Sequence, residues 1–357
     1  MPQSPAESDL LLGILIRPAR MAELSEAEWD KVLPLARATH LLARLASKAQ
    51  EGDFADRLPN RVQVHLRAAA VVATHHARTI SWELGRIERA LGYLNVPILL
   101  LKGAAYVAAR LPAAEGRFVG DIDIMVPRAA LEAVEAALED AGWERMKLDP
   151  YDQRYYRTWM HELPPLRHGE RGTVVDVHHA ILPPTARLKP DPEQLWAMAQ
   201  RLPGRRLHVL APADMVLHSA AHLFHDGDLH RSLRNLVEIH DLLTHFGAMP
   251  DFWPALVPRA SALSLGRPLC YALRYCRRLL DTPVPEITMS QAMADAPAPT
   301  TLALMDRIVP SALITGSGDL GGGALLLYVR SHWLRMPPWL LAPHLARQTS
   351  RRFMGKA

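Results

Sequence analysis

The feature that most constrains this chain is a short apolar segment, residues 120–126, that carries two aspartates one residue apart. The alternation of Asp121, Ile122, Asp123 and Ile124 predicts a β-strand, in which side chains at positions i and i+2 point to the same face. Two neighbouring carboxylates repel each other unless a cation lies between them. Mg²⁺ suits such oxygen ligands and is usually held by one or two carboxylates together with substrate phosphates. The alternative interpretation is an acidic strand end that binds nothing.

A second motif lies upstream of this strand. Residues 96–101 form a short apolar run typical of a buried strand, and Lys102 and Gly103 separate it from residues 104–110, which have a helical composition. A cation and a permissive backbone at the start of a helix favour the binding of phosphate, because free N–H groups and the helix dipole attract anions there. The alternative is a glycine that merely allows a tight turn, with Lys102 in solvent.

A third strand is predicted at residues 173–178, where Val175 and Val177 face one way and Asp176 and His178 face the other. Asp176 would add a third carboxylate to the predicted metal site. Arg117 precedes Asp121 by four residues, so a loop between helix and strand would bring its guanidinium to the same site; a solvated loop arginine is the alternative.

The order of predicted elements indicates a small α/β unit between helical regions. Apolar residues spaced four, three, four and three apart between Ile80 and Leu94 predict a helix that leads into the first strand. Residues 183–193 are rich in proline and mark a boundary. We therefore expect a helical region at 1–78, an α/β core at 79–190 and a second helical region at 191–357.

Three stretches together resemble a bacterial family of nucleotidyltransferases in the DNA polymerase beta superfamily, in its subfamily with a Lys-Gly turn ahead of the D-x-D strand. They read ELGRIERALGYLNVPILLLKGAAYVAARL, RFVGDIDIMVPRAALEAVEAALEDAGW and VVDVHHAIL. The resemblance extends to Trp29, Leu35, Ala36 and His40, to RSLRNLVEIHDLL, and to YVRSHWLRMPP near the C-terminus. It implies an α+β or α/β fold, with a small mixed-sheet nucleotidyltransferase core embedded in mainly helical N- and C-terminal regions.

The same resemblance implies a metal-dependent enzyme that moves NMP from an NTP, with ATP favoured, to an acceptor hydroxyl and releases pyrophosphate. Asp121, Asp123 and Asp176 would bind two Mg²⁺ ions, for which Mn²⁺ can substitute, and would be the catalytic residues. The helix that follows the histidine-rich segment would add arginine forks, which suit phosphate binding. The residues predicted to contact the nucleotide or its metal are Lys102, Gly103, Arg117, Gly120, His178, Arg231 and Arg234.

Other functions remain open at this point. The same metal site would also support phosphoryl transfer, as in a kinase, and a nucleotide-binding module without catalysis is a third reading. A net charge of +4 favours a polyanionic ligand such as an NTP, but it falls short of a nucleic-acid footprint, which needs clustering on one face. This disfavours nucleic acid as the acceptor, and the resemblance implies a peptide or small molecule instead.

Composition predicts a cytoplasmic protein. The two cysteines, Cys270 and Cys276, are too few for a disulfide scaffold. The apolar run near the N-terminus lacks the features of a signal peptide, and no segment approaches the roughly 18 consecutive apolar residues of a membrane span.

Two further motifs are alternative candidates for a functional site. His218 and His222 lie four residues apart on a predicted helix and would reach one metal, but packing and hydrogen bonding explain a histidine-rich helix face as well, and we favour that interpretation. The glycines of residues 316–323 match a dinucleotide fingerprint, yet no strand precedes them, so we expect a loop.

Overall fold

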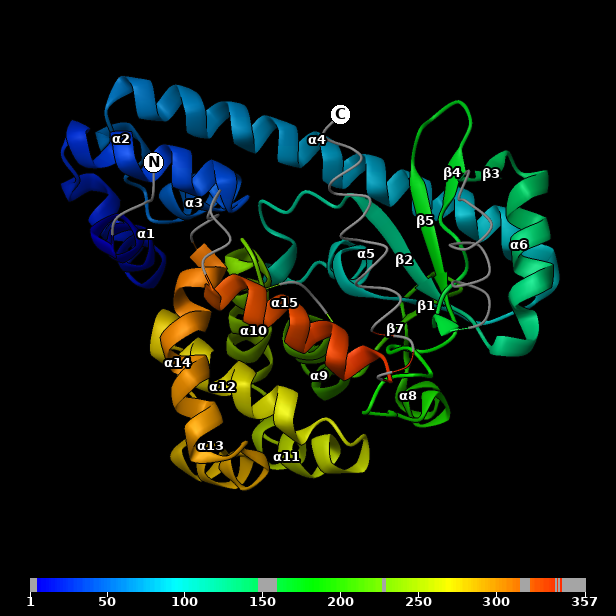
Figure 1. Ribbon diagram of the computed structural model, residues 1–357. Helices are drawn as coiled ribbons and strands as arrows, with labels where there is room; N and C mark the ends of the chain where they lie inside the picture. Colours follow the sequence, from blue (N-terminus) through cyan, green and yellow to red (C-terminus); the bar gives the residue numbers. More distant parts are fainter. Residues whose placement is uncertain are drawn as a thin grey trace, which may run out of the picture.

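The computed structural model describes residues 5–146, 159–226, 229–314 and 322–337, together with residues 339 and 341. Helices surround one mixed sheet (Figure 1). This arrangement confirms the predicted fold class, a mixed-sheet core embedded in helical regions. No helix in the described part of the chain is long and apolar enough to cross a membrane.

The sheet contains seven strands in the order β3-β4-β5-β2-β1-β7-β6. The pairs β2–β5 and β1–β7 are parallel, whereas the other neighbours are antiparallel. The strand bounds are β1 Ile98–Leu100, β2 Asp121–Met125, β3 Trp143–Arg145, β4 Leu166–His168, β5 Val174–His178, β6 Gln200–Arg201 and β7 Leu207–Val209.

The three strands predicted from the sequence are present as β1, β2 and β5. The other four were not expected, because strands of two or three residues are too short to show an alternating pattern. The sheet therefore takes β6 and β7 from a stretch beyond residue 190, where only helices were predicted.

Helix α4, Asn60–Leu91, is the longest in the structure and runs past the sheet, contacting both α5 and α6 (Figure 1). The predicted boundary after residue 78 falls inside α4, so this helix belongs to both the predicted N-terminal helical region and the predicted α/β core. Its apolar stripe behaves as expected, because Ile80, Leu84 and Ile87 are buried. Helix α5, Lys102–Ala108, follows β1 directly, and α6, Leu131–Asp140, follows β2 after a short 3₁₀ turn.

Apart from α8, which lies near β7, the remaining helices gather at the other side of the molecule, where N-terminal and C-terminal segments meet (Figure 1). The Gly-rich segment predicted as a loop lies mostly outside the described residues, and α15 begins at Gly322. The bounds are α1 Pro5–Ile16, α2 Glu26–Ala38, α3 Leu42–Glu51, α8 Pro192–Met198, α9 Pro212–Ala221, α10 Leu233–Phe246, α11 Phe252–Ala262, α12 Gly266–Leu280, α13 Glu286–Ala292, α14 Pro299–Ile314 and α15 Gly322–Arg335.

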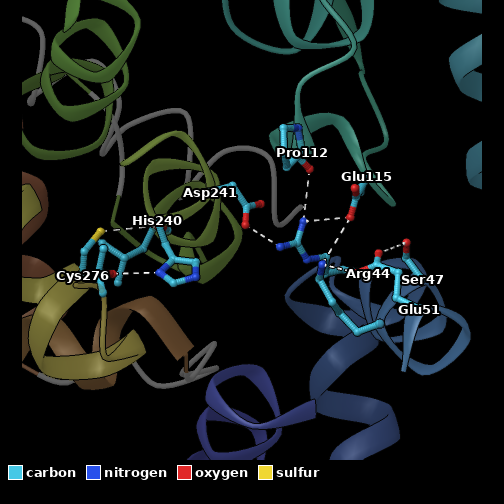
Figure 2. Close-up of polar contacts among 11 residues, drawn as sticks. Arg44, Ser47, Glu51, Pro112, Glu115, His240, Asp241 and Cys276 are labelled. Atoms are coloured by element: carbon cyan, nitrogen blue, oxygen red, sulfur yellow. Dashed lines mark hydrogen bonds and ion pairs between the residues drawn. The ribbon is translucent and has the colours of Figure 1, made fainter. Parts of the chain in front are cut away.

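A buried arginine joins the N-terminal helices to the rest of the chain (Figure 2). Arg44, on α3, donates from Nη1 to the Pro112 carbonyl at 3.1 Å and forms an ion pair with Asp241 on α10. Its second ion pair is with Glu115, at 3.6 Å. The loop that contains Pro112 and Glu115 passes directly against the backbone of α3 at Gly116. A Cβ at Gly116 would collide with the amide of Arg44, and the φ of +65° at this residue also favours glycine. One guanidinium thus holds three separate segments of the chain together.

We expect Arg44→Ala to lower the free energy of unfolding by about 3–5 kcal/mol, because it leaves the buried Asp241 carboxylate without its partner. Burial raises the pKa of Asp241 to about 6, although Arg44 opposes this effect. The folded state therefore binds a proton that the unfolded state releases, and stability falls as pH rises from about 4 to the folded pKa.

Removing Arg44 raises the pKa of Asp241 in the folded state further. The loss in the free energy of unfolding, measured with urea, should therefore be larger at about pH 8 than at about pH 5. Arg61→Ala is the matched control, since its ion pair with Asp30 is largely exposed and worth about 1 kcal/mol at most. Equal losses in the two variants would contradict the role given to Arg44.

Candidate functional site

The three predicted aspartates lie on one face of the sheet. In the parallel pair β2–β5, Asp123 is directly opposite Asp176, and Asp121 is opposite Val174. Because i and i+2 residues share a face, this register brings Asp121, Asp123 and Asp176 together. The opposite face belongs to the core, as expected.

The carboxylate of Asp123 is already balanced by positive charge. It is 3% exposed, and its Oδ1 accepts a hydrogen bond from Lys102 Nζ at 2.8 Å and lies 3.0 Å from His178 Nε2. Burial alone would raise the pKa of Asp123, but Lys102 and His178 hold it well below its usual range. Likewise, burial opposes the charge of Lys102, yet Asp123 raises the pKa of this ammonium above its ordinary value.

The backbone of Lys102 is unusual for a residue with a side chain. It is the first residue of α5, and its φ of +44° lies in the left-handed region. Such a conformation persists only where the surroundings fix it, and it is frequent at functional sites. The turn between β1 and α5 therefore directs the ammonium at Asp123.

Among the residues that the structure describes, Asp176 has no comparable partner. Its Oδ1 is buried without a hydrogen-bond partner in the described part of the chain. Burial raises the pKa of Asp176 to about 7, with further contributions from the charges of Glu162, Asp123 and Asp121. A divalent cation beside Asp176 would supply the missing positive charge, and all-oxygen donors are those that Mg²⁺ prefers. The residues present thus fit the predicted metal.

Sequence reasoning missed Glu162, which faces the same site. Glu162 pairs with His178 through an isolated antiparallel bridge, and its Oε2 lies 3.2 Å from His178 Nδ1. His178, which the sequence predicts on the same face as Asp176, therefore lies between the carboxylates of Asp123 and Glu162. No alternating pattern around residue 162 could have indicated this contact.

Three of the predicted phosphate-binding residues meet around Glu238 on α10. Arg117 forms an ion pair with Glu238, and its guanidinium lies 5.4 Å from the ring centre of Tyr106. Gly103 is buried beneath Arg117, and a Cβ at this position would collide with the guanidinium. Arg234 donates from Nε to the same carboxylate at 2.9 Å and from Nη1 to the Phe118 carbonyl at 3.1 Å.

The other two residues of the predicted set are exposed. Gly120 immediately precedes β2, and no described residue would contact a Cβ there. Arg231 has a φ of +55°, and its backbone amide donates to the Ala312 carbonyl. The structure does not bring Arg231 into the Glu238 cluster, and its phosphate role stays a prediction.

His218 on α9 and His222, the first residue of the following π-helix His222–Asp226, lie close enough to Lys102 to be affected by its charge. Burial and the charge of Lys102 lower the pKa of His218 to about 3, and Lys102 and burial lower that of His222 well below its ordinary value. Neither belongs to a group of three metal-ligating side chains among the described residues. This placement favours packing over zinc binding, as the sequence suggested.

The unequal environments of the aspartates generate a prediction for the metal-free protein. Asp176→Asn should leave the free energy of unfolding unchanged or increase it, because it removes a buried charge that lies among like charges. Asp123→Asn should lower it by about 1–3 kcal/mol, since Lys102 loses its hydrogen-bonded partner. Urea unfolding in the presence of a chelator measures both, with Asp121→Asn as the exposed control. Stabilisation by Asp123→Asn would contradict this assignment.

Comparison with known families agrees with this geometry. A family model described as an uncharacterised nucleotidyltransferase matches residues 25–281, which include all seven strands and every predicted site residue. No curated protein matches the chain. Because the match covers well over half of the sequence, the chain belongs to this family of nucleotidyltransferases.

Proposed function

We propose that this protein transfers a nucleoside monophosphate from an NTP, ATP in the first instance, to an acceptor hydroxyl and releases pyrophosphate with the help of Mg²⁺. The observation that carries the proposal is the register of β2 and β5, which gathers Asp121, Asp123 and Asp176 on one face in a chain of this family. A binding module without catalysis has no need for three convergent carboxylates.

Mg²⁺ bound by the three aspartates would polarise the phosphate oxygens and stabilise the attacking and leaving groups of an in-line displacement. The chain's own cations would hold the triphosphate. With only seven residues, α5 has a short dipole, so the ammonium of Lys102 is the main attraction for phosphate there. Arg117, beside Gly103, is the second cation, and its planar fork suits two phosphate oxygens.

Asp176 is suited to the acceptor side. It lies directly opposite Asp123 on the same face, and a carboxylate within reach of the acceptor hydroxyl would serve as its general base. In the proposed step the acceptor oxygen attacks the α-phosphorus, the bond from this phosphorus to the bridging oxygen breaks, and pyrophosphate leaves. The proton of the hydroxyl passes to Asp176, and His178, held by Asp123 and Glu162, borders this position.

Labelled ATP tests the reaction type. With Mg²⁺ and a desalted extract of peptides and small molecules as the acceptor source, label from the α-phosphate should move to an acceptor and unlabelled pyrophosphate should be released. Label from the γ-phosphate should appear only in pyrophosphate. A γ-phosphate that reaches the acceptor while the α-label stays in ADP would instead establish phosphoryl transfer, whose metals act on the γ-phosphate.

In the same assay Asp121→Asn and Asp123→Asn should each reduce turnover at least about 100-fold, because each removes a ligand of metal ions worth several kcal/mol to the transition state. Asp140→Asn, an exposed substitution on α6, is the matched control and should keep full activity. Turnover within a few-fold of wild type in either site variant would remove the metal assignment.

Asp176→Ala should impair catalysis more than nucleotide affinity, because its proposed task lies at the acceptor. Calorimetric titration with a non-hydrolysable ATP analogue and Mg²⁺ compares this variant with Asp121→Asn. We expect the Asp176 variant to bind the analogue within a few-fold of wild type while transfer is lost. An affinity loss as large as that of Asp121→Asn would show that the roles are assigned to the wrong residues.

A further inference from the structure

A second group of metal-ligating side chains borders the aspartates. His161, Glu162 and His178 each offer a ligand atom, and these three atoms lie within 4.8 Å of one another. The two histidines are 5% and 2% exposed, and Glu162 is partly buried. We call these three residues the His-Glu-His cluster. Unlike the all-oxygen aspartate site, it combines two nitrogens with one carboxylate.

The hydrogen bonding of His178 leaves one of its nitrogens facing a carboxylate. Lys102 keeps Asp123 ionised, so Nε2 of His178, 3.0 Å from Asp123 Oδ1, carries the hydrogen that it donates there. In the neutral ring Nδ1 then bears a lone pair, and it lies 3.2 Å from Glu162 Oε2 without forming a hydrogen bond. Either a proton on Nδ1 or a metal ion would satisfy these two acceptors.

His161 provides the independent observation. Its Nδ1 is buried and has no hydrogen-bond partner among the described residues, although a buried ring nitrogen is normally satisfied. Its ring centre lies 5.1 Å from that of His178, so the two imidazoles are neighbours. A ligand shared by His161, Glu162 and His178 would satisfy the unpartnered nitrogens of both histidines.

We propose that the His-Glu-His cluster binds a divalent transition-metal ion, Zn²⁺ in the first instance, through His161, Glu162 and His178. Two imidazoles with one carboxylate suit zinc, whereas Mg²⁺ selects oxygen ligands. Zinc with bonds of about 2.0–2.1 Å holds its ligand atoms roughly 3.3 Å apart, which rotation of the side chains can reach from the observed spacing. Three protein ligands leave a fourth position for water or an acceptor atom.

This site would be coupled to the aspartates through His178. A metal-bound histidine usually donates its other N–H to a carboxylate, which fixes the ring and strengthens it as a ligand. Asp123 occupies that position, so the same carboxylate would support the zinc ligand and the nucleotide metal site. The proposal concerns metal binding in the absence of nucleotide and stands independently of the reaction proposed above.

Metal titration of the full-length protein tests the proposal. The protein is stripped with a chelator and titrated with Co²⁺ and Zn²⁺ without nucleotide, while cobalt absorption and bound metal per chain are recorded. Wild type should bind one ion in the cluster, and His161→Ala and Glu162→Gln should each weaken binding at least about 100-fold. His179→Ala, a half-buried neighbouring histidine, and Asp121→Asn, which changes the magnesium site, are controls that should bind as wild type does.

Unfolding temperatures with and without Zn²⁺ give a second readout, because an ion that binds only the folded state stabilises it. Zn²⁺ should raise the midpoint of wild type and of the controls but not that of Glu162→Gln, which keeps the side-chain volume if His161→Ala fails to fold. Equal Zn²⁺ binding by wild type and Glu162→Gln, or none by wild type, would overturn the proposal. His178 would then be an imidazolium that bridges Asp123 and Glu162 without a metal.

Discussion

The site depends on the register between β2 and β5. Because side chains alternate, a slip of one residue would turn Asp176 into the core and bring Val175 or Val177 to the acidic face. Ile122, Ile124 and both valines are fully buried on the other face, so the apolar side of the two strands fixes the register. Core packing therefore holds together carboxylates that would otherwise separate.

Positive charge is unevenly placed on the face of the sheet that carries the aspartates. Lys102 and His178 both lie against Asp123, whereas the buried oxygen of Asp176 has no partner among the described residues. The sequence alone does not distinguish Asp123 from Asp176 as metal ligands, but the fold gives each a different environment. An added cation gains most beside Asp176, because there it relieves repulsion without displacing an existing ion pair.

The sequence predicts those parts of the site that follow a local period. Alternation identifies β2 and β5, and it correctly separates Val175 and Val177 from Asp176 and His178. The spacing of apolar residues likewise predicts the second half of α4. These features could be read because each depends on residues that are close in the chain.

The parts that the sequence could not predict depend on contacts between distant segments. His161 and Glu162 stand in the segment HELPPL, where prolines interrupt any pattern, and only a single bridge to His178 brings them to the site. The strands β6 and β7 are too short to carry a period and become strands by pairing with β1 and with each other. Local propensity contains no information about such pairings.

Helix α10 connects the helical regions to the arginines that are proposed to bind phosphate. Glu238 forms ion pairs with Arg117 and Arg234. Asp241 lies three residues later, on a neighbouring part of the helix surface, and forms an ion pair with Arg44. The N-terminal helices, the loop before β2 and α10 are consequently fixed relative to one another by buried ion pairs.

This arrangement has a consequence for how Arg117 would reach a triphosphate. A buried carboxylate that loses its only cation is strongly destabilised, which would oppose any movement of Arg117 away from Glu238. Arg234 removes that obstacle, because it remains bonded to Glu238 through Nε when Arg117 turns. In the proposed complex, phosphate oxygens would replace the carboxylate as the partner of Arg117, and Glu238 would keep Arg234 as its partner. Under the proposed function, Arg234 would therefore act by staying bonded to Glu238, which frees Arg117 for the phosphates.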